Sequence, residues 1–129
     1  MTLGEKLNNP LNIRYNQHNH WQGQVGQNGG FVNFANYIWG LRAAAVILKQ
    51  YRKRGIVTVE KIISTWAPAS ENDTESYIKY VCRRTGMTRL MVVDSVPLVK
   101  GLICAMIEME TGMKISSETV SNIVKAVGI

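Results

Sequence analysis

One carboxylate in the sequence follows a long apolar segment, where it could act as a proton donor. Glu110 lies near the end of residues 94–112, DSVPLVKGLICAMIEMETG. At roughly 100° per residue, Val99, Ile103 and Met106 fall on one helical stripe, and the carboxylate falls on the same stripe. If the end of this stripe lines a cleft, the carboxylate loses hydration, which raises its pKa and lets it hold a proton near neutrality. A glycosidase needs such a group as its general acid.

A second carboxylate could come from the acidic run that precedes another predicted helix. Glu71, Asp73 and Glu75 lie close together there. The helix dipole stabilises carboxylates at this end of a helix, so the cluster could be purely structural. It could also place Glu71 or Asp73 across a cleft from Glu110. Glu5 is a further candidate for this second carboxylate. A simpler interpretation exists for Glu110 too, a solvated ion pair with Lys114 that contributes on the order of a few tenths of a kcal/mol.

The first thirty residues are rich in Asn, Gln and Gly, which favours turns over helix. Amide side chains donate and accept hydrogen bonds, and aromatic rings stack on pyranose faces, so this composition suits the binding of neutral sugars. Alternatively, the amides only satisfy the turns of a loop-rich lobe. The candidates for binding a glycan are Asn9, Asn12, Tyr15, Trp21 and, in a later helix, Tyr77.

Helices must position these residues, and the sequence marks where they begin and end. For the segment that carries Glu110, Asp94 or Ser95 can cap the N-terminus, and Gly112 supplies a left-handed stop. Similar signals predict four further helices over residues 36–55, 58–66, 72–86 and 116–127, the third with a capping box from Asn72 to Glu75. A short strand is predicted over residues 11–13 and irregular or hairpin structure over residues 21–30. The predicted fold is mainly α, with a small irregular or β lobe near the N-terminus.

Length and charge limit the range of functions. A chain of 129 residues suffices for one core, so we predict a single domain over residues 1–129. Lys and Arg outnumber Asp and Glu by 15 to 9, and the formal charge of +6 suits an anionic partner such as nucleic acid, a membrane surface or the bacterial envelope. The clusters Arg52–Arg54 and Arg83–Arg84 could bind phosphates, although cations near a helix C-terminus also favour its dipole.

Cysteine usage and the N-terminus bear on location and cofactors. Cys82 and Cys104 have no metal-binding or CxxC spacing, so we expect reduced, structural thiols, and neither a metal nor a cofactor. A disulfide between the two is the alternative. His18 and His20 flank an Asn, but the further ligands of an HNH nuclease are not evident. The N-terminal residues MTLGEKLNNP lack a basic segment followed by an apolar run, so we expect no signal peptide. No apolar stretch approaches the roughly 18 residues of a membrane-spanning helix. We therefore expect synthesis in the cytoplasm, with delivery to the envelope, the periplasm or a virion by another route.

Four segments with distinctive motifs carry a resemblance that covers most of the chain: Asn8–Tyr15 (NNPLNIRY), Trp21–Gly23 (WQG), Gly30–Ala44 (GFVNFANYIWGLRAA) and Ile62–Val81 (IISTWAPASENDTESYIKYV). They resemble a small family encoded by phages and prophages, whose members are usually described as virion or structural proteins. The WAPxxENDTxxY run is the most specific part of this resemblance.

The order of motifs is also distantly similar to that of lysozyme-like glucosaminidases and lytic transglycosylases. Those enzymes have an NLFGIK-like segment followed by W-x-G, which match Asn9–Arg14 and Trp21–Gly23. Their acidic helix, with an A-I-x-x-E-S-G-like ending, precedes these motifs, whereas the similar Ala105–Gly112 (AMIEMETG) follows them here. The resemblance implies a circularly permuted lysozyme-like domain, with Glu110 as the general acid and Glu108 as the fallback.

This interpretation predicts cleavage of β-1,4 glycosidic bonds in peptidoglycan, by a muramidase or lysozyme, a glucosaminidase or a lytic transglycosylase. Hydrolysis and transglycosylation are both open. The predicted partners are peptidoglycan glycan strands and, in addition, phage virion proteins. One alternative is a noncatalytic virion component, which an exposed apolar patch would mark. The least favoured alternative is a nucleic-acid-binding module.

Overall fold

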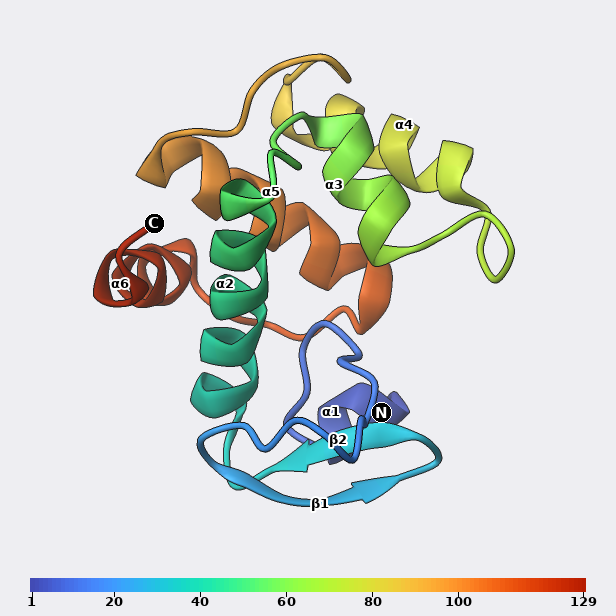
Figure 1. The fold of residues 1–129 in the computed structure, drawn as a ribbon, viewed down its shortest axis with the longest axis vertical. Helices are drawn as coiled ribbons and strands as arrows, with labels where there is room; N and C mark the ends of the chain where they lie inside the picture. Colours follow the sequence, from blue (N-terminus) through green and yellow to red (C-terminus); the bar gives the residue numbers. More distant parts are fainter.

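The computed structural model describes residues 1–129 as six helices and one two-stranded antiparallel sheet. The helices are α1 (Leu3–Lys6), α2 (Tyr37–Lys53), α3 (Val59–Trp66), α4 (Thr74–Thr85), α5 (Val96–Glu110) and α6 (Ser117–Val127), and the strands are β1 (Gln24–Asn28) and β2 (Phe31–Phe34). In Figure 1 the sheet and α1 lie at one end of α2, and α3 and α4 lie at the other. The predicted mainly helical class with a small β lobe near the N-terminus is confirmed.

Helix α5 contributes much of the hydrophobic core and packs against α4 and α6. Ser95 caps its N-terminus and Gly112, with a φ of +69°, follows its C-terminus, as predicted. The apolar stripe of this helix faces inward. Because Glu110 lies on the same stripe, in the last turn, it is half-buried. The buried residues of that stripe include Val99, Ile103 and Met106.

Local signals set most of the other helix boundaries. Asn36 caps α2, Thr58 caps α3 and Ser116 caps α6, in each case by accepting a hydrogen bond from a first-turn amide. Helix α4 ends at Gly86, whose φ is +78°. None of the helices combines the length and the apolar composition needed to cross a membrane.

Two predictions about helices are wrong. Helix α4 is capped by Asp73 instead of Asn72, because the Asp73 carboxylate accepts hydrogen bonds from both the amide (3.1 Å) and the hydroxyl (2.8 Å) of Ser76. The N-terminal residues were predicted to lack helix, yet α1 forms one turn there. Its capping box between Thr2 and Glu5 is a local signal that the amide-rich composition obscured.

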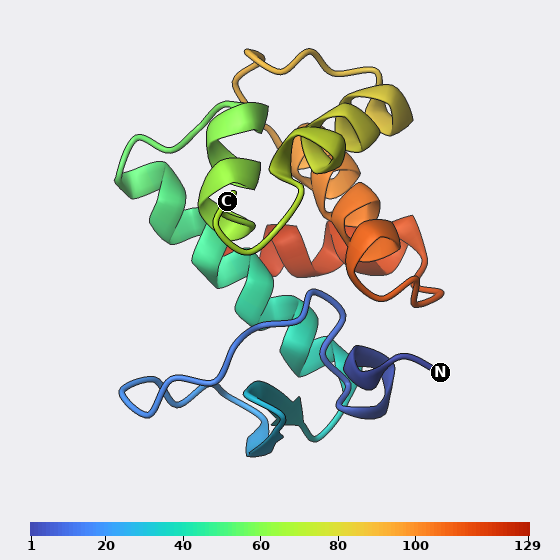
Figure 2. The same cartoon turned by 90° about the vertical axis from the view of Figure 1, so that its right-hand side faces the viewer.

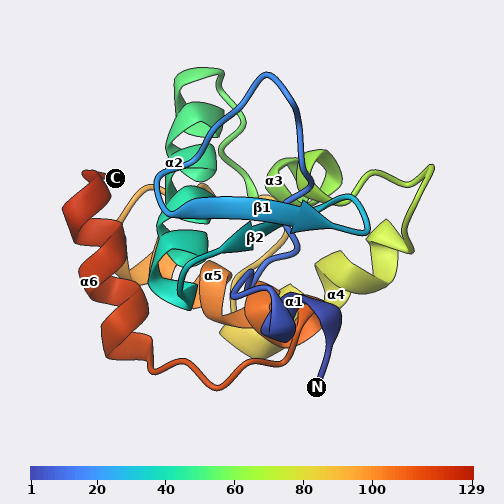
Figure 3. The same cartoon turned by 90° about the horizontal axis from the view of Figure 1, so that it is seen from below.

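The N-terminal lobe, residues 1–36, contains the sheet. Strands β1 and β2 are joined by two glycines that both have positive φ, as a two-residue hairpin turn requires. The short strand predicted over residues 11–13 does not form, and only an isolated bridge joins Arg14 to Phe31. Seen from below in Figure 3, the hairpin lies across the end of α2, beside α1.

A fully buried amide holds this lobe together. The Asn9 side chain donates hydrogen bonds to the carbonyl oxygens of Ile13 and Val32, each at 3.0 Å, and accepts one from the Ile13 amide at 2.9 Å. It thereby pairs the Ile13 amide and adds a hydrogen bond to each of two backbone carbonyl groups, one of which also accepts from the Val32 amide.

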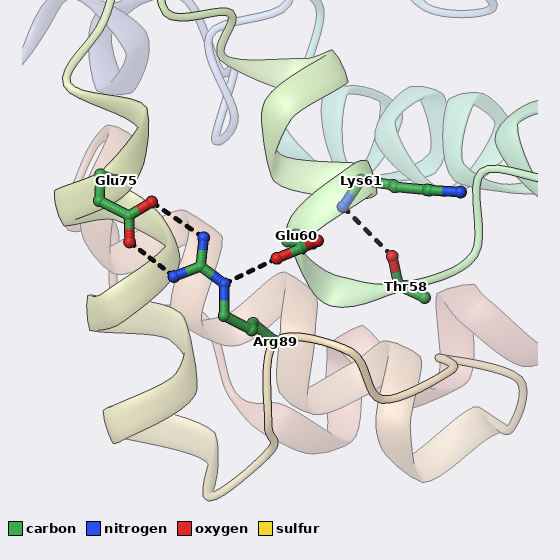
Figure 4. Close-up of polar contacts among 5 residues, drawn as sticks. All are labelled: Thr58, Glu60, Lys61, Glu75 and Arg89. Atoms are coloured by element: carbon green, nitrogen blue, oxygen red, sulfur yellow. Dashed lines mark hydrogen bonds and ion pairs between the residues drawn. The ribbon is translucent and has the colours of Figure 1, made fainter.

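An arginine ties α3 to α4 on the outer surface of the helical region (Figure 4). Arg89 donates from Nε to Glu60 at 2.6 Å and from Nη1 and Nη2 to Glu75 at 2.6 and 2.9 Å. The guanidinium lowers the pKa of the Glu75 carboxyl below its ordinary value. We call these three residues the Arg89 cluster. It links the two helices that carry Trp66 and Tyr77.

Candidate active-site cleft

A cleft of about 580 Å³ opens between the N-terminal lobe and the helical region. Figure 2 shows this lobe below the helices. The cleft is lined by amides, carboxylates and aromatic rings drawn from both parts of the chain. The polar lining residues include Asn12, Arg14, Asn16, Asn19, Gln50, Glu71, Asn72 and Glu110, and the aromatic ones are Tyr15, Trp21, Phe31, Tyr51 and Trp66.

Neutral donors hold both carboxylate oxygens of Glu110. The Asn12 side-chain amide donates to Oε1 at 2.9 Å and also to the carbonyl oxygen of Glu110 at 3.2 Å. The Tyr77 hydroxyl donates to Oε2 at 2.9 Å. No ion pair of the structure includes Glu110, so the solvated pair with Lys114 does not form.

The local conformation at Asn12 directs its amide to this carboxylate. Leu11 and Ile13 are buried on either side of it, so the residue between them points out of the lobe core. Asn12 has a φ of +54°, in the left-handed region that Asn tolerates better than most residues. The alternation of apolar and polar residues over 11–13, which is also typical of a strand, thus directs the Asn12 side chain to the end of α5.

Tyr77 has a different place from the one predicted. Its side chain is 5% exposed and does not line the cleft, so its hydroxyl meets Glu110 from within the protein. Burial raises the pKa of Tyr77 far above its ordinary value, and the negative charge of Glu110 raises it further. Tyr77 therefore remains a protonated donor near neutrality, and it positions Glu110 instead of contacting a glycan.

Two other predicted site residues serve the fold. Asn9 is fully buried and engaged with backbone groups, so it cannot reach a ligand in the cleft. Asp73 lies outside the cleft lining and caps α4. The hydrogen bonds from Ser76 lower the pKa of the Asp73 carboxyl. Both corrections have one cause, because a polar side chain that satisfies nearby backbone groups is no longer available to a ligand.

The structure brings the remaining predicted residues together. The Oε1 atom of Glu71 lies 4.0 Å from Nη2 of Arg14, and the Glu71 side chain is 52% exposed. Trp21 is half-buried and Tyr15 is exposed. The predicted site residues that line the one cleft are Asn12, Tyr15, Trp21, Glu71 and Glu110.

Other candidates lie away from the cleft. Glu108, the fallback acid, pairs with Arg84 at 2.9 Å. The basic residues Arg52–Arg54 and Arg83–Arg84 are absent from the cleft lining. His18 and His20 are exposed, and no group of three His, Cys, Asp or Glu side chains is arranged to hold a metal ion.

Several lining residues were not identified from the sequence. Trp66 and Asn72 belong to the WAPxxENDTxxY run, so a signal for them existed. Gln50 and Tyr51 follow one another in α2, and their helical pattern gave no indication that the helix end would border a cleft.

With this geometry established, the chain can be compared with known proteins. It is 39% identical over 114 residues to Protein P5 of Pseudoalteromonas phage PM2, and the alignment covers 84% of this chain and 71% of the phage protein. The chain therefore belongs to the same family as this phage protein, Protein P5. No protein-family model matches the chain.

Proposed function

We propose that this protein cleaves β-1,4 glycosidic bonds of peptidoglycan, with Glu110 as the general acid. The observation that carries the proposal is the position of Glu110, half-buried in a cleft and held on both oxygens by neutral donors. Since no cation pairs with Glu110, its protonation leaves no buried positive charge unpaired. Its surroundings of amides and aromatic rings suit a glycan.

In the proposed reaction Glu110 gives its proton to the leaving glycosidic oxygen, and positive character develops at the anomeric carbon. The Tyr77 hydroxyl can donate to Oε2 both when Glu110 is ionised and when Glu110 carries its transferable proton on Oε1. It can therefore hold Glu110 throughout the cycle, while that proton stays available to the glycosidic oxygen. Asn12 holds the other oxygen and thereby fixes the orientation of the carboxyl group.

Glu71 is the candidate second carboxylate, because it lines the same cleft. As a base it would activate a water molecule on the opposite face of the sugar, which is the inverting mechanism. Participation of the substrate's acetamido group, or formation of an anhydro sugar, would need no second carboxylate. Whether activity requires Glu71 therefore separates the inverting mechanism from the mechanisms that need no second carboxylate.

We further propose that the fold is a circularly permuted lysozyme-like domain. Its support is the proximity of the end of α5 to the beginning of the chain. The Thr111 hydroxyl donates to the Pro10 carbonyl oxygen at 2.9 Å, and the Thr2 hydroxyl donates to the Thr111 carbonyl oxygen at 3.4 Å. The acidic helix and the NLFGIK-like segment, Asn9–Arg14, thus lie side by side. The helix follows that segment in this chain, whereas it precedes the segment in the lysozyme-like enzymes.

The test is release of muropeptides from purified peptidoglycan by wild type, Glu110→Gln and Glu71→Gln, followed by mass spectrometry. We expect release by wild type and none by folded Glu110→Gln. Anhydro ends would identify a transglycosylase, and reducing ends a hydrolase. Loss of activity in Glu71→Gln would favour the inverting mechanism. If wild type releases nothing, the catalytic proposal is wrong.

A second candidate is a noncatalytic component of a virion. It is favoured by kinship to a phage protein and by exposed apolar residues between α4 and α5, where Leu90 is 68% exposed and Val92 is 44% exposed. The same release experiment separates the two candidates, because a structural component would leave peptidoglycan intact.

A further inference from the structure

We propose that Arg14 makes the cleft select glycans that carry carboxylate groups over neutral glycans. This inference rests on the proposed function and names the substrate class for the same cleft. Its starting point is that Arg14 is the one cationic side chain among the residues that line the cleft. The other charged lining residues are the carboxylates of Glu71 and Glu110.

The structure anchors Arg14 but leaves its donors free. Its backbone forms an isolated bridge with Phe31, and its guanidinium lies over the Phe31 ring, 5.5 Å from the centroid. The side chain is 66% exposed and makes no hydrogen bond to the protein. Glu71 is its nearest ionic partner, at 4.0 Å, which exceeds hydrogen-bonding distance.

A guanidinium presented in this way suits a carboxylate ligand. Its planar fork of N–H groups matches the two oxygens of a carboxylate, and charged hydrogen bonds of this kind are stronger than neutral ones. Two carboxylates in the same cleft disfavour a dense polyanion such as nucleic acid. A glycan with isolated carboxylates offers a partner to Arg14 and carries too little charge to be strongly repelled by these two groups.

Among β-1,4 glycans this distinction separates peptidoglycan from chitin. Chitin is neutral, whereas peptidoglycan carries carboxylates from two sources. Where the stem peptide has been removed, the lactyl group of the muramic acid ends in a carboxylate. Where the stem peptide is present, that group is amidated and the carboxylates belong to the peptide.

The test compares three substrates, namely chitin oligosaccharides, peptide-free glycan strands and stem-bearing strands. Wild type, Arg14→Gln and Arg83→Gln are assayed on each. Arg83 is a matched control, because its guanidinium also lies over a ring, that of Tyr80 at 5.9 Å, but it is outside the cleft lining. We expect Arg14→Gln to lower the kcat/KM ratio of charged to neutral glycan roughly tenfold to a hundredfold, mainly through KM. Arg83→Gln should leave the ratio unchanged.

The outcomes separate this inference from the proposed function. If Arg14→Gln lowers the ratio only for peptide-free strands, the ligand of Arg14 is the lactyl carboxylate. If it lowers the ratio only for stem-bearing strands, the ligand is a carboxylate of the peptide. If wild type cleaves glycans and Arg14→Gln keeps the wild-type ratio on both, the selectivity inference is wrong and the catalytic proposal stands. If wild type cleaves nothing, binding of the same glycans is measured by calorimetry. Arg14-dependent binding would then support this inference alone, and its absence would overturn both.

Discussion

The cleft and the surface of α3 and α4 hold their carboxylates in opposite ways. In the cleft, Glu110 accepts hydrogen bonds from the neutral groups of Asn12 and Tyr77. On the surface, the two glutamates of the Arg89 cluster, Glu60 and Glu75, share its guanidinium. An arginine stabilises the ionised form of a carboxylate, whereas neutral donors fix its orientation without adding a positive charge. The partners of a carboxylate, more than its residue type, therefore distinguish a candidate acid from a structural ion pair.

The largest expected effect comes from replacing one of the two carboxylates near the C-terminus of α5. Glu110→Gln removes the proposed proton donor and should lower kcat for glycan cleavage about a thousandfold. Glu108→Gln removes a carboxylate of the same helix that pairs with Arg84 outside the cleft, and it should retain activity. Rates of reducing-end or muropeptide release measure both, with circular dichroism to verify folding. Equal losses in the two variants would contradict the comparison.

The next effect tests the neutral donor on the buried side of the carboxylate. Tyr77→Phe keeps the buried ring and removes the hydroxyl that holds Oε2 of Glu110. Because Tyr77 does not line the cleft, we expect kcat to fall roughly tenfold to a hundredfold with little change in KM. A rise in KM with kcat unchanged would mean that Tyr77 contacts the glycan after all.

A third effect concerns stability instead of activity. Asn9→Ala deletes three hydrogen bonds to buried backbone groups and should lower the free energy of unfolding by about 2 kcal/mol or more. Asn19→Ala, an exposed amide of the same lobe, should change it by less than about 0.5 kcal/mol. Urea titrations at neutral pH provide both values. Similar values for the two variants would refute the structural role of Asn9.

The smallest effect is expected at the Arg89 cluster and depends on pH. The pKa of Glu75 is lower in the folded protein than its ordinary value of 4.5, so this group contributes stability above pH 4.5. That contribution is lost as the pH falls through the folded pKa. Arg89→Met should therefore be slightly less stable than wild type at pH 7, and the difference should shrink below pH 4.5. Thermal unfolding between pH 7 and pH 3 tests this, and a constant difference would contradict it.

Local sequence signals predict the five longer helices and the position of Glu110 at the end of one of them. Ser95, Thr58 and Ser116 cap helices where they were predicted to, and the left-handed glycines 86 and 112 follow helix ends. These features are predictable because each depends on a hydrogen bond or a backbone conformation within about four residues. The apolar stripe of α5 is a local property of the same kind, since helical geometry alone places its members on one face.

The contacts of the polar residues follow from the tertiary structure instead. Asn12 meets Glu110 across 98 positions of the chain, and Tyr77 approaches the same carboxylate across 33. Asn9 and Asn12 have the same side chain three residues apart, yet one satisfies buried backbone groups and the other faces the cleft. Composition cannot separate them, because each role follows from which backbone groups and side chains the folded chain brings within hydrogen-bonding distance. The sequence supplied the chemical groups, and long-range packing assigned them to structure or to the cleft.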